Sequence, residues 1–240
     1  MISIIIPTKN EENFLPRLLR SLNAQTFQEF EVIVADAFST DRTRAIAVSF
    51  GAKVVDGGLP GFGRNTGARH AKGDVILFLD ADVFLPPNFL EANYKFFMKR
   101  GLDCATTLMR PLSTRFDDQL IHSAWNAAYL FFQRWYPVAA GFHIFVKRSV
   151  FERVGGFDHS IVFAEDVDFV SRVHKSRGRF RVIRRVPVYI SVRRLEKEGR
   201  FGFLAKSIYG FCYAFFRGPI RKPIFNYEFG HDSVNRQADS

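Results

Sequence analysis

The chain has 240 residues, of which 47% are hydrophobic and 24% charged, and its formal net charge is +10. This composition is typical of a globular protein with a substantial core, and it excludes collagen-like, low-complexity and disordered chains. The two cysteines, Cys104 and Cys212, lie far apart in the sequence and form no Cys-x-x-Cys pattern. The sequence therefore predicts neither a disulfide scaffold nor a structural zinc site. It predicts instead that the protein works in a reducing compartment.

The amino-terminal residues and the hydropathy pattern bear on location. The apolar run 1–6 has no basic segment before it and no cleavage pattern after it, and no window reaches the roughly 18 apolar residues of a membrane span. We therefore expect neither a cleaved signal peptide nor a transmembrane helix. The expected location is cytoplasmic.

Short apolar runs alternate with helical patterns over the first 80 residues, which is typical of an α/β domain with a mostly parallel sheet. The expected strands are 2–6, 32–35, 54–55 and 75–79, and the expected helices are 14–22, 39–48 and 64–71. Asn10 is expected to cap the first helix. Ligands of such sheets bind at the carboxyl ends of the strands, so Pro7, Asp36 and Asp80 should meet at one edge.

The later chain predicts further elements and no linker or internal repeat. The expected helices are 88–100, 119–136, a short one from 149, one from 165 and one from 193, and the expected strands are 105–109, 144–146 and 180–190. The predicted architecture is therefore a Rossmann-like central sheet, mostly parallel, that is flanked by helices.

Two aspartates, Asp80 and Asp82, follow the fourth expected strand. If the strand period of two continues, both carboxylates point the same way, a geometry that suits Mg²⁺ or Mn²⁺ bound to a diphosphate. An ordinary polar strand end explains the pair equally well when it is considered alone. The neighbouring glycine-rich stretch, 57–64, matches neither a P-loop nor a dinucleotide-binding fingerprint, which argues against an ATPase and a dehydrogenase.

Several motifs occur in a fixed order along the chain: 3–12 (SIIIPTKNEE), 32–36 (VIVAD), 67–82, 145–157 (FVKRSVFERVGGF) and 164–168 (AEDVD). Together they resemble the inverting family 2 glycosyltransferases of GT-A fold, over roughly residues 2 to 200. The resemblance implies a catalytic domain at 1–200, with a nucleotide-sugar half at about 1–110 and an acceptor half at about 111–200. An amphipathic helical extension at 201–240 would follow it.

The resemblance also implies roles for individual residues. The donor nucleotide sugar would be bound by Pro7, Thr8, Glu11, Asp36, Arg64, Asp80 and Ala81, and Asp82 with Asp80 would hold Mn²⁺ or Mg²⁺. Asp166 would be the general base, and the acceptor or diphosphate would be contacted by Gly141, Glu165, Arg194 and Arg200. A direct displacement at an α-linked donor would give a β-linked product. Without the resemblance, the acids at 11, 36 and 165–166 can equally be ordinary helix-start or turn residues.

Basic residues are concentrated late in the chain, because residues 171–222 carry a net charge of +13 and the remainder carries −3. Residues 201–229 add ten aromatic side chains in 29 positions. These features favour attachment to an anionic membrane surface and a lipid-linked or saccharide acceptor, with no role for nucleic acid. Packing of this segment on the core, or a dimer contact, is the alternative.

Two departures from the family pattern and two rival functions complete the prediction. The chain lacks the Gln-x-x-Arg-Trp motif of processive synthases, so transfer of a single sugar is expected, and Lys9 stands where lipid-directed relatives often carry an aromatic residue. One rival is a nucleotidyltransferase, although Pro7 to Asn10 occupy the place of its glycine-rich loop. The other is a non-catalytic binder of anionic lipid or polymer, whose binding would fall steeply with salt.

Overall fold

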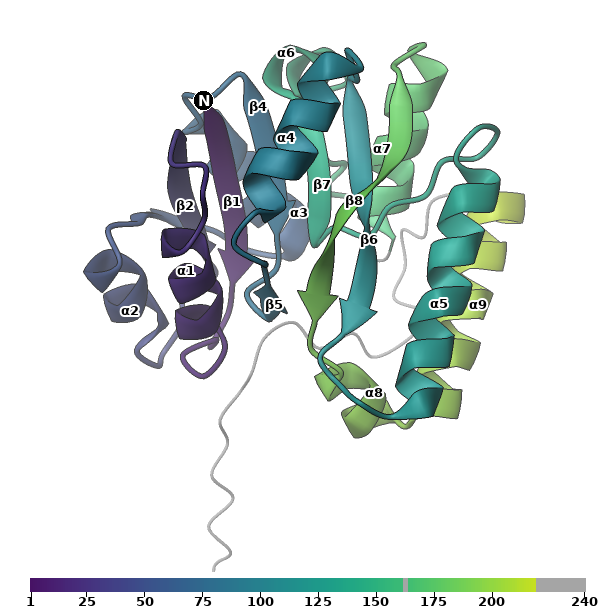
Figure 1. The fold of residues 1–240 in the computed structure, drawn as a ribbon, viewed down its shortest axis with the longest axis horizontal. Helices are drawn as coiled ribbons and strands as arrows, with labels where there is room; N and C mark the ends of the chain where they lie inside the picture. The colour runs from purple at the N-terminus through teal and green to yellow at the C-terminus, as the bar shows by residue number, and fades with distance from the viewer. Residues whose placement is uncertain (162–163, 219–240) are drawn as a thin grey trace, which may run out of the picture.

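A computed structural model describes residues 1–161 and 164–218 as one eight-stranded sheet covered by helices (Figure 1). The elements in chain order are β1 (Ile2–Thr8), α1 (Leu15–Asn23), β2 (Phe30–Asp36), α2 (Thr43–Ser49), β3 (Lys53–Asp56), α3 (Pro60–Arg69), β4 (Val75–Leu79), β5 (Val83–Phe84), α4 (Phe89–Lys99), β6 (Cys104–Pro111), α5 (Phe116–Phe132), β7 (His143–Lys147), α6 (Arg148–Arg153), α7 (Glu165–Lys175), β8 (Phe180–Ile190), α8 (Arg193–Glu198) and α9 (Arg200–Arg217).

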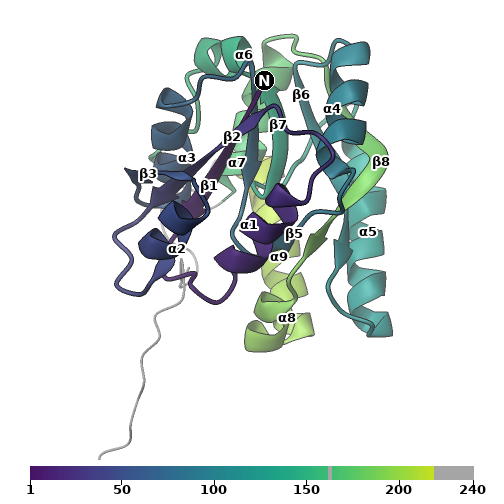
Figure 2. The same cartoon turned by 60° about the vertical axis from the view of Figure 1, so that its left-hand side comes forward.

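The strand order is β3-β2-β1-β4-β7-β6-β8-β5, and its first four strands are parallel. This half confirms the α/β prediction: β1 and β4 are buried at every position, as expected for strands covered on both faces. Helices α1 and α4 lie on one face, and α3, α6 and α7 lie on the other (Figures 1 and 2).

The second half of the sheet is mixed. β7 runs antiparallel to both β4 and β6, β8 is parallel to β6, and the short β5 pairs antiparallel with the end of β8. Because β7 is antiparallel to β4, its first residues lie beside the carboxyl end of β4, and His143 pairs with Leu79. The sheet thereby brings residues that precede β7 and residues that follow β4, β8 and β1 to the same edge.

A phenylalanine cluster fixes α7 against the sheet. The ring of Phe157 stacks on Phe169 of α7, with centroids 4.6 Å apart, and meets Phe78 of β4 edge-on at 5.1 Å. Asn65 of α3 holds the same segment, because its side-chain amide donates to the carbonyl of Phe157 and its Oδ1 accepts from the Phe157 amide, both at 2.8 Å. The amino terminus of α7 is thus positioned by β4 and α3.

Two local expectations were wrong. Asn10 does not cap α1: it has a φ of 51°, its Oδ1 accepts from the amide of Thr40 at 2.8 Å, and α1 begins later, at Leu15. Asp80 and Asp82 do not continue a strand, because Asp80 follows the end of β4 and residues 81–82 form a turn before β5. The strand period therefore does not set the directions of the two carboxylates.

The predicted carboxyl-terminal extension is helical where it is described. α9 covers Arg200–Arg217, and its first turn is joined to the first turn of α5. Residues 219–240 of the predicted extension lie outside the described residues. Within 1–161 and 164–218, no helix is both long and apolar enough to cross a membrane.

Candidate active site

Acidic residues from three separate segments meet at the carboxyl edge of the sheet, and two arginines lie between them. The acids are Glu11 after β1, Asp80 and Asp82 in the turn after β4, and Glu165 with Asp166 at the start of α7. The arginines are Arg64 of α3 and Arg193 of α8. Each arginine bonds to two carboxylates that are distant in sequence, so the edge is held together by charge.

Arg64 links the donor side of the predicted site to the acceptor side. Its Nη2 donates to Asp80 Oδ1 at 2.9 Å and its Nη1 donates to Glu165 Oε1 at 2.7 Å. The residue is only 3% exposed, and its guanidinium lies 5.5 Å from the centroid of the Phe157 ring. A buried arginine that is hydrogen-bonded to two carboxylates in this way fixes the separation between the acidic turn and α7.

Gly141 lies directly against this guanidinium. A Cβ added to Gly141 would be 2.6 Å from Arg64 Cζ, a separation that real Cβ contacts do not show. The backbone amide of Gly141 also donates to Asp166 Oδ2 at 2.7 Å. The absence of a side chain at 141 therefore allows one backbone segment to contact both Arg64 and the predicted base.

Asp166 is half-buried at the start of α7. Its Oδ1 accepts from the amide of Val167 at 2.8 Å, in addition to the Gly141 bond at its other oxygen. Burial and the negative charge of Glu165 raise the pKa of Asp166 to about 7, although the Arg64 charge opposes the shift. A carboxylate with such a pKa is suited to accept a proton near neutral pH.

Arg193 holds the other part of the acidic edge. Its Nη1 and Nη2 donate to the two oxygens of Glu11 at 2.8 and 2.9 Å, and its Nε lies 2.9 Å from Asp82 Oδ2. Burial raises the pKa of Glu11 and of Asp82, and the charge of Arg193 opposes both shifts. The two aspartates of the turn thus contact different arginines.

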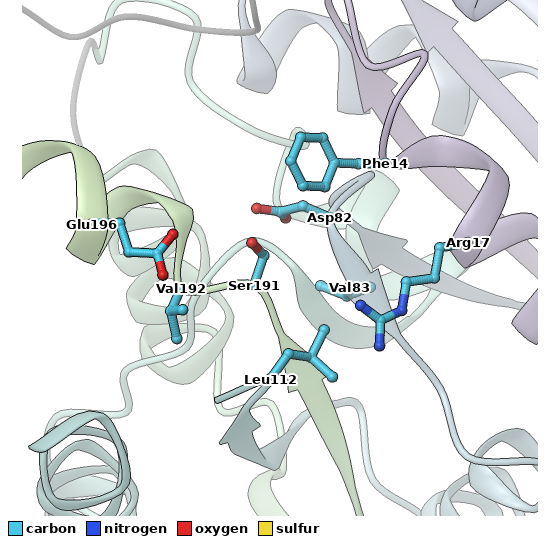
Figure 3. Close-up of a pocket in the computed structure, with 8 residues that line it drawn as sticks. All are labelled: Phe14, Arg17, Asp82, Val83, Leu112, Ser191, Val192 and Glu196. Carbon is cyan, nitrogen blue, oxygen red and sulfur yellow. The ribbon is translucent and has the colours of Figure 1, made fainter. Parts of the chain in front are cut away.

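A cavity of about 200 Å³ adjoins Asp82. Its lining residues are Phe14, Arg17, Asp82, Val83, Leu112, Ser191, Val192 and Glu196. Figure 3 shows the Asp82 carboxylate and the Ser191 hydroxyl pointing toward one another at one side of this cavity. The cavity lies between the start of α1 and the segment that leads into α8.

The predicted nucleoside pocket lies at the ends of β1 and β2, where Pro7, Thr8 and Asp36 are fully or almost fully buried. Asp36 accepts from Thr8 Oγ1 at 3.1 Å, from the amide and hydroxyl of Ser39 at 3.0 and 2.5 Å, and from Arg44 at 3.3 Å. These bonds tie the loop after β2 to β1. Contact between Asp36 and a nucleoside stays a prediction.

The structure brings most predicted site residues together, with one clear exception. Arg200 lies with α5, because its Nε is 2.9 Å from Asp118 Oδ1 and 3.1 Å from Asp117 Oδ2. Arg194 is exposed, and its charge opposes the rise that burial causes in the pKa of Asp82. Sequence analysis assigned no role to Arg193, although this residue makes the direct contacts with Glu11 and Asp82.

A parallel half-sheet with an acidic turn at its carboxyl edge, continued by a mixed half-sheet that carries a second acidic pair, defines the GT-A class of glycosyltransferase fold. The mannosyltransferase of Pyrobaculum calidifontis, solved with GDP-Man and Mn²⁺, matches with a TM-score of 0.68 at 21% sequence identity. The match covers 87% of this chain and 64% of the mannosyltransferase chain. The TarS structure of Staphylococcus aureus matches with a TM-score of 0.64 at 25% identity and covers 80% and 36%.

Sequence comparison identifies the family. The model described as Glycosyl transferase family 2 matches residues 3–155, so the chain belongs to that family. The poly(ribitol-phosphate) beta-N-acetylglucosaminyltransferase TarS is 32% identical over 123 residues, 47% of this chain and 22% of TarS. The 4,4'-diaponeurosporenoate glycosyltransferase of Staphylococcus haemolyticus is 43% identical over 93 residues, 35% and 24%. The matched region spans less than a quarter of either relative.

The contact between Gly141 and Arg64 predicts a coupled pair of substitutions. Gly141→Ala should lower the free energy of unfolding by about 1–3 kcal/mol, because the new methyl group overlaps a guanidinium that two carboxylates hold in place. In an Arg64→Ala background the same substitution should cost much less, since the overlapping group is gone. Urea denaturation of the wild type, both single variants and the double variant measures this; additive costs would contradict the contact.

Proposed function

We propose that the protein is a metal-dependent inverting glycosyltransferase. It moves a single sugar from a UDP- or GDP-linked donor to a lipid-linked or saccharide acceptor. The observation that supports this most is that Arg64 bonds both to Asp80, in the acidic segment after β4, and to Glu165, the neighbour of Asp166 at the start of α7. A donor diphosphate on the turn and an acceptor at α7 would then meet across a fixed distance.

The side chains at the turn fit a metal–diphosphate complex. Mg²⁺ and Mn²⁺ prefer oxygen ligands and are commonly held by one or two carboxylates together with phosphate oxygens. Among the residues that the structure describes, no group of three or more acidic, histidine or cysteine side chains is arranged to hold a metal alone. Asp82 with Asp80 therefore suits a cation whose remaining ligands come from the donor. When bound, the cation would neutralise charge on the departing diphosphate.

The two solved relatives support the donor class. One neighbour is solved with GDP-Man and Mn²⁺, and TarS is solved with UDP-GlcNAc, with a TM-score of 0.64 at 23% identity. Both ligands are nucleoside diphosphate sugars. The base and the sugar used by this chain stay open between these two types.

Asp166 would act on the acceptor. Its carboxylate takes the proton of the acceptor hydroxyl while that oxygen bonds to the anomeric carbon, and the bond from this carbon to the donor diphosphate breaks. Attack from the side opposite the leaving group inverts the anomeric centre, so an α-linked donor gives a β-linked product. Glu165, held by Arg64, would orient the acceptor, and Gly141 would keep the Asp166 carboxylate in place.

Donor binding gives the first functional test. UDP- or GDP-sugars with Mn²⁺ should raise the melting temperature of the wild type by several degrees, because a ligand that binds only the native state stabilises it. Asp82→Asn should lose most of this metal-dependent rise. Asp74→Asn is the matched control, since Asp74 is an exposed acid at the other end of β4. Equal shifts in both variants, or no shift with any donor, would contradict the proposal.

The raised pKa of Asp166 predicts a pH profile for transfer to a hydroxyl acceptor. Because a general base must be unprotonated, the rate should fall as the pH drops through the pKa of about 7. Glu165→Gln removes a negative charge that raises this pKa, so the acid limb should move to lower pH. Initial rates from pH 5 to 9 measure this, with Glu91→Gln, which changes a partly exposed acid on α4, as the control. An unmoved limb in Glu165→Gln would contradict this assignment.

An apolar surface on α5 and α9 supports attachment to an anionic lipid surface. Phe116 and Phe201, in the first turns of the two helices, are 80% and 92% exposed. Residues 119–132 of α5 and Gln133, which follows it, contain no charged side chain. Further exposed apolar residues in or next to the two helices are Leu120, Phe131, Trp135, Ile208 and Tyr209. The net charge of +13 over residues 171–222 would add electrostatic attraction.

Vesicle binding tests this attachment. The double variant Phe116→Ser, Phe201→Ser should sediment several-fold less with vesicles that contain phosphatidylglycerol, because two exposed rings no longer enter the interface. Val48→Ser, 63% exposed on α2, is the control and should bind like the wild type. Equal binding of all three proteins, or equal binding to neutral vesicles, would contradict the proposed surface.

A further inference from the structure

One guanidinium holds two carboxylates that the proposed function assigns to different parts of the donor. Glu11 belongs to the nucleoside side, and Asp82 belongs to the side of the cation and diphosphate. All three nitrogens of the Arg193 guanidinium are used in these contacts, at 2.8, 2.9 and 2.9 Å. Arg193 therefore bridges two subsites that one donor molecule would have to occupy together.

Arg193 supplies the positive charge that these buried acids require. Glu11 is 4% exposed, and the side chain of Asp82 is 12% exposed. Two carboxylates so far from water, with Asp80 nearby, repel one another unless a cation lies between them. The ring of Phe14, 4.6 Å from Arg193 Cζ, adds a cation–π contact on the guanidinium face. The arginine is thus well stabilised in its present position.

The same position of Arg193 opposes the binding of a divalent cation at Asp82. The Arg193 guanidinium bonds to Oδ2 of the carboxylate that is proposed as metal ligand, and two positive groups on one oxygen repel strongly in a partly buried site. Metal binding at Oδ2 therefore requires Arg193 to leave this oxygen. The segment that carries Arg193 borders the cavity of about 200 Å³, where Ser191, Val192 and Glu196 form part of the wall (Figure 3).

We propose that Arg193 is a positioning residue that acts as an internal cation. It holds Glu11 and Asp82 in the ligand-free protein and is displaced from Asp82 when the divalent cation binds. This inference rests on the proposed function, because the metal role of Asp82 belongs to it. A consequence is coupling: a nucleoside that displaces Arg193 from Glu11 also weakens its hold on Asp82, so each ligand makes the other bind more tightly.

The experiment measures Mn²⁺ binding without any nucleotide, by the loss of the free-ion electron paramagnetic resonance signal. Arg193→Gln should bind Mn²⁺ at least ten-fold more tightly than the wild type, because the competing charge has gone. Arg115→Gln, which removes an exposed arginine paired with Asp117, is the control of equal charge change and should bind like the wild type. Adding Asp82→Asn to Arg193→Gln should abolish the gain, which locates the ion at Asp82.

A second measurement, the melting temperature with and without Mn²⁺, keeps the test valid if Arg193→Gln is less stable than the wild type. Arg193→Gln leaves Glu11 and Asp82 without their shared partner, so its melting temperature should be lower, and Mn²⁺ should raise it more than it raises that of the wild type. Arg193→Lys, which keeps the charge but has one donor group, should show an intermediate Mn²⁺ affinity. Equal or weaker Mn²⁺ binding by Arg193→Gln would overturn the inference.

The outcome for Arg193 is separable from the outcome for the proposed function. Tighter Mn²⁺ binding by Arg193→Gln, in a protein that binds no nucleotide sugar, would support the internal cation and reject the transferase proposal. Donor-dependent stabilisation and sugar transfer by the wild type, with unchanged Mn²⁺ affinity in Arg193→Gln, would do the reverse. If Arg193→Gln instead loses binding of nucleoside diphosphates in the presence of a chelator, the arginine replaces the metal, and displacement is overturned.

Discussion

The candidate site depends on two arginines that hold acids from distant segments against one another. Five carboxylates lie at the sheet edge, and two arginines, Arg64 and Arg193, lie among them. If all five carboxylates are ionised, the edge keeps an excess of negative charge. Buried carboxylates without partners would destabilise the fold, so each arginine has a structural role before any ligand arrives. The remaining negative charge is what makes this edge attractive to a cation that brings its own anionic ligand.

Antiparallel pairing of β7 with β4 makes this edge a junction between the halves of the chain. It places Gly141 next to the end of β4, and the phenylalanine cluster around Phe157 places α7 behind it. Arg64 then spans from Asp80 to Glu165. The carboxylates that we propose to serve the donor and the acceptor are consequently positioned by one unit of sheet and helix, which would favour a reproducible geometry in the proposed displacement.

Sequence analysis predicted the parallel half of the sheet because its strands are continuous apolar runs that end in polar residues, as at Ile2–Thr8 and Val75–Leu79. The end of the fourth apolar run indicated Asp80 and Asp82, and the resemblance to family 2 glycosyltransferases pointed to Glu11, Glu165 and Asp166. Sequence analysis could not predict partners. The pairing of Arg193 with Glu11 joins residues 182 positions apart, and nothing local distinguishes Arg193 from Arg194. The prediction that Asn10 caps α1 was wrong for a related reason, because its side chain accepts from the distant Thr40 amide instead of from the first turn of α1.

The basic residues of the segment 171–222 have different surroundings in the folded protein. Part of the segment's charge is directed inward or toward neighbouring acids, through Arg172 with Asp168, Arg193 with Glu11 and Asp82, and Arg200 with Asp117 and Asp118. Other members on β8, Arg181, Arg184 and Arg185, are exposed. A net charge of +13 in one segment therefore overstates the charge that reaches the surface, because the acidic remainder of the chain neutralises some of it within the fold. Any attraction of this segment to an anionic surface has to come from those of its basic residues that stay exposed.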